Sequence, residues 1–257
     1  MNLGNTIKLY ISVSCFRFEK RFCYMLNSLA QQQGRKKFEI NVVVSSLIEN
    51  SILLNELCFH FNENHFNVKL NLYHKDIFAF RGLTRNVDFK LADHDSWILF
   101  ADCDHIYRKD FLHNLFNAIE NKHYKNSDVM YTTHRFSMAE GYGNKLVDGN
   151  WSLRSPRYTI PCVDMLIDES NLRKTSNVGA GNTQLIEVKQ FPDRVYVNPS
   201  TCKDKNLFDK GCHPKSDIQF RRSCSKVIKI NDPNIVQYHL NHSRHDSDNK
   251  EAINEQR

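Results

Sequence analysis

Two aspartates stand directly behind a short apolar run. The run covers residues 97–101, and Asp102, Cys103 and Asp104 follow it. Such a run is typical of a strand buried on both faces, so the carboxylates are expected at its end, solvated or paired, because burying a bare charge is costly. Mg²⁺ and Mn²⁺ take carboxylate oxygens and leave positions for phosphate. The spacing favours a divalent-metal site, and a polar turn is the alternative, since Asp is common in turns.

Cationic and amide side chains come shortly before this run. Residues 81–86 include Arg81, Arg85 and Asn86. An arginine beside a diphosphate adds charge-assisted contacts, and an amide can hold the loop next to the strand. The segment is therefore a candidate to contact an anionic ligand, and an exposed helical position is the alternative for Arg85.

The elements that must position these side chains alternate between strand and helix. The predicted strands cover residues 8–14, 38–44, 68–73 and 97–101, and the predicted helices cover 22–29, 52–61, 80–91 and 112–119. Gly34 is expected to end the first helix. In the third helix, Phe80, Leu83, Val87 and Leu91 form the predicted apolar face. The alternation predicts an α/β fold with a mostly parallel central sheet flanked by helices.

Five segments, which make up four matches, resemble the inverting family 2 glycosyltransferases and their relatives with the GT-A fold. Residues 11–14 and 27–32 resemble the family's opening strand and its "SLxxQ" helix, and residues 81–86 resemble its "xxARN" segment. Residues 97–104 resemble "yilflDaD", and residues 216–222 resemble the "EDxdfxxR" helix. The resemblance implies a Rossmann-like GT-A domain that transfers a sugar from a nucleotide-diphosphate donor to a hydroxyl of a glycan or glycolipid, with Mn²⁺ or Mg²⁺ as cofactor.

The resemblance also implies roles for residues late in the chain. Asp217 corresponds to the general base that takes the acceptor's proton, although Ser216 replaces the acid that usually precedes it. His239, with His242 as second choice, corresponds to a late histidine that joins Asp102 and Asp104 on the metal. A surface histidine cluster is the alternative. A structural zinc site is disfavoured, because cysteines at finger spacing are missing.

Ligand contacts around the nucleotide and sugar are less sharply implied. Residues 178–184 are glycine-rich without the lysine of a P-loop, and the family's comparable segment makes Asn182 and Gln184 candidates for sugar hydroxyls; a plain loop is the alternative. The family's "DDGS" segment, which reads the base, is absent after the second strand. Candidates that could replace it are Ser12, Ser14, Ser46 and Asp76. Cys103, between the two aspartates, is a further candidate for contact with the nucleotide-sugar donor.

We expect one domain over residues 1–245, with a nucleotide-binding half over about 1–125 and an acceptor half over about 126–245. The second half is less regular: residues 129–133 and 235–236 predict strands, and 139–177 reads as loops. Residues 246–257 are expected to form a polar tail. Ligands of open α/β sheets bind beyond the carboxyl ends of the strands, so the chemistry is expected there.

Composition narrows the class of protein. The 257 residues carry a formal charge of +6 with scattered basic residues, which indicates a solvated surface or, as the alternative, a preference for anionic ligands or a membrane face. Nucleic-acid binding is disfavoured, because the basic residues are not clustered on one face. The eight cysteines show no CxxC pairing and we identify no secretory signal, so we expect reduced thiols and a cytoplasmic location. If the protein associates with a membrane, we expect it at the inner face of the cell membrane. The alternatives are a sugar nucleotidyltransferase, which would want a glycine-rich loop after the first strand, and a non-enzymatic basic binding module.

Overall fold

The first four strands form the parallel half of a larger sheet. These strands are β1 (Ile7–Ser14), β2 (Phe38–Leu47), β3 (Asn67–Tyr73) and β4 (Trp97–Asp102) in a computed structural model of the chain. The structure describes residues 6–78, 81–121, 129–132, 134–138, 142–143, 167–174, 183–191, 220, 224, 226–230 and 233–240. They lie side by side in the order β3-β2-β1-β4, all parallel. The predicted α/β architecture is confirmed, with each strand within a few residues of its predicted bounds.

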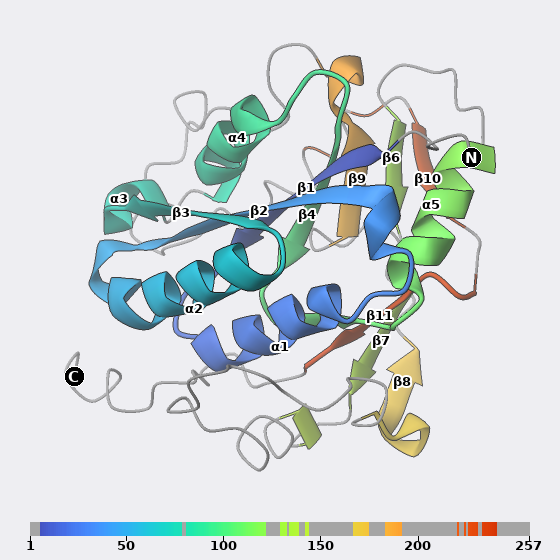
Figure 1. The fold of residues 1–257 in the computed structure, drawn as a ribbon, viewed down its shortest axis with the longest axis horizontal. Helices are drawn as coiled ribbons and strands as arrows, with labels where there is room; N and C mark the ends of the chain where they lie inside the picture. The colour runs from blue at the N-terminus through green and yellow to red at the C-terminus, as the bar shows by residue number, and fades with distance from the viewer. Residues whose placement is uncertain are drawn as a thin grey trace.

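Helices cover both faces of this sheet (Figure 1). The helices are α1 (Glu19–Ala30), α2 (Ser51–Asn64), the short α3 (Lys75–Phe78), α4 (Arg81–Leu91) and α5 (Phe111–Asn121), with single turns η1 (Arg35–Lys37) and η2 (Ile48–Asn50) flanking β2. One core cluster joins the sheet to α1, α2 and α5, and a separate cluster joins Phe89 of α4 to the opposite face of β4. The chain adds β2 and β3 on one side of β1 and then returns to add β4 on the other side. Because crossover connections between parallel strands are right-handed, this reversal of direction places α4 on the face opposite α1 and α2.

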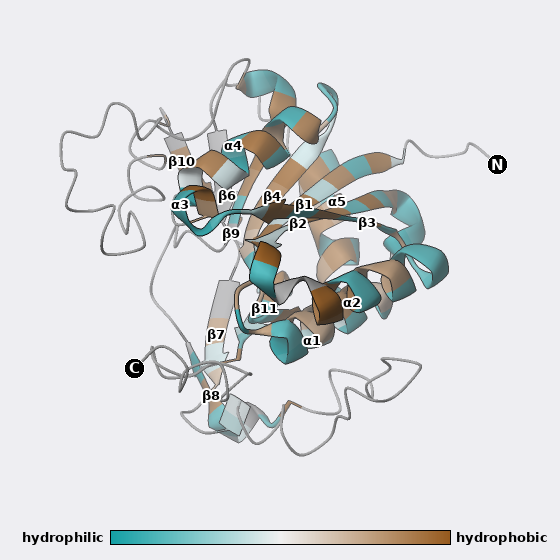
Figure 2. Cartoon of the chain, turned by 90° about the vertical axis from the view of Figure 1, so that its left-hand side faces the viewer, coloured by the Kyte–Doolittle hydropathy of each residue, from teal (hydrophilic) through white to brown (hydrophobic). Residues whose placement is uncertain are grey.

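Side chains alternate between these two clusters along each strand. Leu99 and Ala101 of β4 belong to the cluster with α1, whereas Ile98 and Phe100 belong to the cluster with α4. This two-sided burial is why residues 97–101 are apolar without interruption. Figure 2 shows hydrophobic residues along the central strands and hydrophilic residues on the outer sides of α1 and α2.

The central sheet continues with strands from the second half of the chain. β9 (Thr183–Glu187) pairs antiparallel with β4, in register from Trp97 opposite Glu187 to Ala101 opposite Thr183. β6 (Val129–Thr132) follows β9, and β10 (Lys226–Lys229) lies at the edge, giving the order β10-β6-β9-β4-β1-β2-β3. One turn, η4 (Val188–Gln190), follows β9. The sheet thus contains strands from both predicted halves, although the halves themselves stay a prediction.

A small second sheet begins directly after the two aspartates. Its strands are β5 (His105–Tyr107), β11 (Val236–His239), β7 (His134–Met138) and β8 (Leu172–Lys174), in that order, with the turn η3 (Glu169–Asn171) before β8. β11 runs antiparallel to β5, with His239 opposite His105. Figure 1 shows this sheet below β4 and α5. It brings the end of the described chain next to residues 102–104.

The buried face of α4 differs from the predicted one. Val87 and Leu91 are 42% and 36% exposed, whereas Thr84, Arg85 and Asp88 are buried. The prediction was therefore wrong for Val87 and Leu91, because helical spacing alone assumes that the buried residues are apolar; Leu83 is half-buried, and Phe80 lies outside the described residues. Asp88 and Arg85 have polar partners in the sheet, and the hydroxyl of Thr84 donates to the carbonyl oxygen of Arg81 within α4, which offsets part of the cost of burying these groups.

Gly34 does not end α1, which stops at Ala30. It precedes η1 with a φ of +76°, a conformation that glycine adopts without strain. A Cβ at this position would lie 3.0 Å from the Cα of His113 in α5. The glycine therefore serves the contact between this turn and α5, and not the end of the helix.

Gln32 ties α1 to the segment between β5 and α5. Its Nε2 donates to the carbonyl oxygens of Ser28 (2.8 Å) and Arg108 (2.9 Å), and its Oε1 accepts from the N–H of Leu112 (2.9 Å). The side chain is buried. Each of these backbone groups would lose a partner if the amide were removed, which costs about 1–3 kcal/mol per buried group.

Gln32→Leu should therefore lower the free energy of unfolding by about 3 kcal/mol, since it keeps the volume and removes the hydrogen bonds. Urea denaturation measures the change. Gln33→Leu is the matched control, because Gln33 is exposed and its backbone N–H, which the substitution keeps, makes the hydrogen bond to the carbonyl oxygen of Lys109. Equal stability of the two variants would contradict the role of Gln32.

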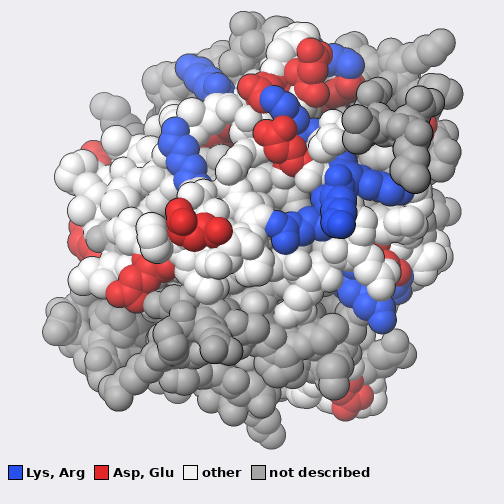
Figure 3. All heavy atoms as spheres, viewed as in Figure 1, with Lys and Arg blue, Asp and Glu red and all other residues white. Residues whose placement is uncertain are grey.

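Charged side chains are spread over the surface. On the face shown in Figure 3, lysine and arginine side chains form small groups interspersed with acidic ones, with no continuous basic stripe among the described residues. No helix within the described part of the chain is long and apolar enough to cross a bilayer. The predicted cytoplasmic location and the lack of a nucleic-acid partner stay predictions.

Candidate active site

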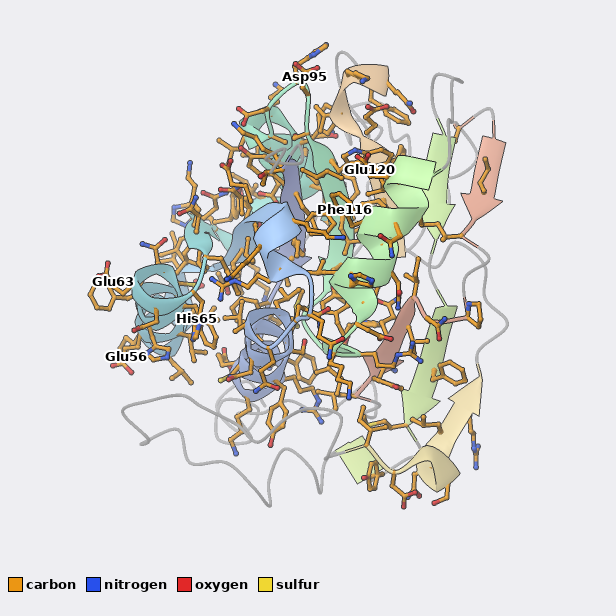
Figure 4. The ribbon with its side chains drawn as sticks, turned by 45° about the vertical axis from the view of Figure 1, so that its right-hand side comes forward. Glu56, Glu63, His65, Asp95, Phe116 and Glu120 are labelled. Atoms are coloured by element: carbon orange, nitrogen blue, oxygen red, sulfur yellow. The ribbon has the colours of Figure 1, made fainter. Side chains whose placement is uncertain are left out.

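The end of β4 places two carboxylates at the carboxyl edge of the parallel strands. Asp102 is the last residue of β4 and lies opposite Ser14, the last residue of β1. Asp104 comes two residues later, before β5, and is buried. Asp95, labelled in Figure 4, lies just before the amino end of β4, at the other end of the strand from Asp102. The predicted position of the aspartate pair at a strand end is what the structure shows.

Two imidazoles flank the carboxylate of Asp104. Nδ1 of His105 lies 2.9 Å from its Oδ1, and Nε2 of His239 lies 3.0 Å from its Oδ2. The pairing of β5 with β11 sets this arrangement, because His105 and His239 face each other across the two strands. The N–H of Leu240 also donates to the carbonyl oxygen of Asp104 at 2.8 Å. His239 thus lies beside Asp104, and its role as a metal ligand stays a prediction.

Two arginines of α4 approach Asp102. Nη1 of Arg81 donates to its Oδ1 at 3.1 Å, and Nη2 of Arg85 lies 3.7 Å from the same atom. Arg85 is almost fully buried, with its guanidinium 5.4 Å from the ring centroid of Phe100, whereas Arg81 is 34% exposed. Arg81 can therefore reach an incoming anion, while Arg85 holds positive charge beneath the strand end.

The donor atoms present suit a divalent cation. The ligand atoms of Asp102, Asp104 and His105 all lie within 4.8 Å of one another, and carboxylate oxygens with imidazole nitrogen are acceptable ligands for Mn²⁺. The arginines keep the local charge from becoming strongly negative, and space for phosphate oxygens is needed on the exposed side of Asp102. The residues fit the metal that the sequence predicts.

The remaining predicted contacts differ in how accessible they are. Ser12 and Ser46 are buried, and their hydroxyls donate to Asp88 Oδ2 (2.6 Å) and to the carbonyl oxygen of Cys15 (2.6 Å). Cys103 and Gln184 are buried as well, whereas Ser14 and Asn86 are half-buried and Asp76 is exposed on α3. Their predicted roles toward the nucleotide and sugar stay predictions.

Three predicted site residues lie outside the described residues. They are the candidate base Asp217, the candidate sugar contact Asn182 and the second histidine candidate His242. The nearest described residues along the chain are Thr183 at the start of β9, Phe220, which packs on Phe100, and Leu240 just after β11. These three roles therefore stay predictions as well.

Sequence reasoning missed His105 and Asp88. His105 directly follows Asp104, so the run of three potential ligands in four residues was a visible signal. Asp88 gave a weaker signal, as one acid inside a helix with apolar neighbours. Burial raises the pKa of the Asp88 carboxyl to about 6, against hydrogen bonds from Ser12, Asn71 and Ser45 and the charge of Arg85, all of which lower it.

The fold of the chain is similar to that of two solved structures. No family model matches the sequence, and no curated protein matches it. The structure of S. aureus TarS 1–349 aligns with a TM-score of 0.54 at 19% identity over 91% of this chain, and its complex with UDP aligns with a TM-score of 0.54 at 20% identity over 90%. The chain has a GT-A fold. It spans 60% of the length of the TarS fragment in both alignments.

Proposed function

We propose that this GT-A chain is a metal-dependent glycosyltransferase. One observation carries the proposal: Asp102, Asp104 and His105 bring three metal-ligand groups together at the carboxyl edge of the parallel strands. Ligands of open α/β sheets bind at this edge. The UDP complex of TarS supports a nucleoside diphosphate sugar, with UDP as the first nucleotide to test.

Each residue of the site has a task in this proposal. Asp102 and Asp104, with His105 and His239, would hold Mn²⁺ or Mg²⁺, which neutralises charge on the departing diphosphate. Arg81 contacts the phosphates with its exposed guanidinium. Arg85 stays buried and keeps Asp102 in place.

The reaction that we propose is a single inverting displacement. The acceptor's hydroxyl oxygen forms a bond to the anomeric carbon, while the bond from that carbon to the diphosphate oxygen breaks and its electron pair leaves with the nucleotide. Asp217 takes the hydroxyl proton. The acceptor is a hydroxyl of a glycan or glycolipid, in the synthesis of a surface polysaccharide or glycolipid.

Nucleotide-dependent thermal shifts test the function. The chain should be stabilised by UDP with Mn²⁺, by about 2.7 kcal/mol at 100 times the dissociation constant, and excess EDTA should abolish the effect because the diphosphate loses its metal contact. GDP, CDP and TDP are the matched comparisons for the base. Hydrolysis of a nucleotide sugar at full rate in EDTA would contradict metal dependence, and no shift with any nucleotide would contradict the function.

A further inference from the structure

Asp88 is the meeting point of three strands and one helix. Its Oδ2 accepts from the hydroxyl of Ser12 in β1 at 2.6 Å. Its Oδ1 accepts from the hydroxyl of Ser45 in β2 at 3.3 Å and from Nδ2 of Asn71 in β3 at 3.3 Å. The carboxylate is 1% exposed and belongs to α4. A single side chain therefore links α4 to β1, β2 and β3.

The same helix carries the two arginines that contact Asp102. Arg85 lies one turn before Asp88, and Arg81 lies two turns before it at the start of α4. Their guanidinium nitrogens lie 3.7 Å and 3.1 Å from Oδ1 of Asp102. A shift of α4 along or away from the sheet would move both cations relative to the end of β4.

We propose that Asp88 is a positioning residue for this site: its hydrogen bonds to Ser12, Ser45 and Asn71 hold α4 against the sheet so that Arg81 and Arg85 meet Asp102. The inference rests on the proposed function only for its consequence, which is the affinity for a nucleoside diphosphate. The attachment of α4 is a property of the chain without ligand.

Burying the ionised carboxylate of Asp88 lowers the stability of the folded chain. The effect of Asp88 on stability can therefore be distinguished from its effect on the position of α4. The groups that face Asp88 are Ser12 and Ser45, Asn71 and Tyr73 of β3, and the cation Arg85 of its own helix. Burial nonetheless raises the pKa of Asp88 to about 6, above its value in the unfolded chain. Ionised Asp88 therefore favours unfolding, and the cost appears as the pH rises from about 4 to about 6.

Hydrogen exchange on the full chain tests the attachment of α4. In Asp88→Ala, amides of residues 81–91 should exchange at least about tenfold faster than in the wild-type chain, because opening of α4 no longer breaks three hydrogen bonds. Residues 51–64, in α2 on the opposite face, should be unchanged. Unchanged exchange in α4 would overturn the proposal.

Calorimetry with UDP and Mn²⁺ tests the consequence. Asp88→Asn should bind about tenfold more weakly than the wild-type chain, since the carboxylate's charge and one acceptor are lost. Asp93→Asn is the matched control: Asp93 is an exposed acid just after α4 that contacts Lys8, and its variant should bind normally. Equal binding by Asp88→Asn would overturn the proposal. Failure of the wild-type chain to bind any nucleotide would overturn the proposed function instead, and the exchange experiment would still decide whether Asp88 holds α4.

Melting temperatures at pH 5 and pH 8 separate positioning from a structural role. Relative to the wild-type chain, the Tm of Asp88→Asn should rise between pH 5 and pH 8, because the variant avoids the cost of ionising a buried acid. A variant that is more stable at pH 8 and yet binds UDP more weakly supports a positioning role. A variant that is less stable at pH 8 and yet binds UDP as tightly as the wild-type chain would show that the carboxylate serves stability alone, and would overturn the proposal.

Discussion

Asp104→Asn should lower the affinity for UDP in the presence of Mn²⁺ by roughly 100-fold or more, because one metal ligand is lost and the carboxylate that lies beside two imidazoles loses its charge. The substitution keeps the side-chain volume between His105 and His239. Calorimetry with and without Mn²⁺ measures the effect. In EDTA, variant and wild-type chains should bind UDP equally weakly.

The control variant for this experiment is Asp95→Asn, which changes a residue near the amino end of β4. Asp95 precedes β4 and its side chain is 87% exposed, so Asp95→Asn changes the net charge by the same amount away from the site (Figure 4). It should bind UDP and Mn²⁺ as the wild-type chain does. Mn²⁺-dependent binding within twofold of wild type in Asp104→Asn would contradict the metal site.

Asp217→Asn should lower the rate of glycosyl transfer by about 10²- to 10⁴-fold, because the acceptor oxygen then attacks without a base. Affinity for UDP and Mn²⁺ should stay unchanged, which separates a base from a metal ligand. Steady-state kinetics with a verified acceptor, alongside calorimetry, measure the two effects.

Asp168 offers a comparison for that variant. Its carboxylate accepts hydrogen bonds from Ser170 and Asn171, which hold the pKa of Asp168 below its usual range, so it is a poor base. Asp168→Asn should leave turnover nearly unchanged. Normal turnover in Asp217→Asn would show that the base assignment is wrong.

The sequence predicted the elements whose burial follows a simple period. Strands such as β4 are uniformly apolar because both faces are covered, and the aspartates behind it stand out for that reason. The pairing of β9 with β4 could not be predicted, since it joins residues more than 80 positions apart and leaves no local pattern. The same holds for β11 beside β5, which brings His239 to Asp104.

The α4 helix shows a second limit of sequence reasoning. A hydrophobic period selected Val87 and Leu91, but the buried face carries Arg85 and Asp88. Their burial depends on partners in β1–β4 that only the assembled sheet supplies. Sequence periodicity therefore failed where buried polar residues lie close to the proposed site.

The antiparallel strand β9 has a consequence for dividing the chain. Without residues 183–187, the edge of β4 would present unpaired N–H and C=O groups along Ile98, Leu99 and Phe100, all of which are buried in the full chain. An unpaired apolar edge is a template for pairing with another copy. A fragment that stops after α5 would keep both aspartates and both arginines, yet it would tend to self-associate through β4, so studies of nucleotide binding need the chain through β9.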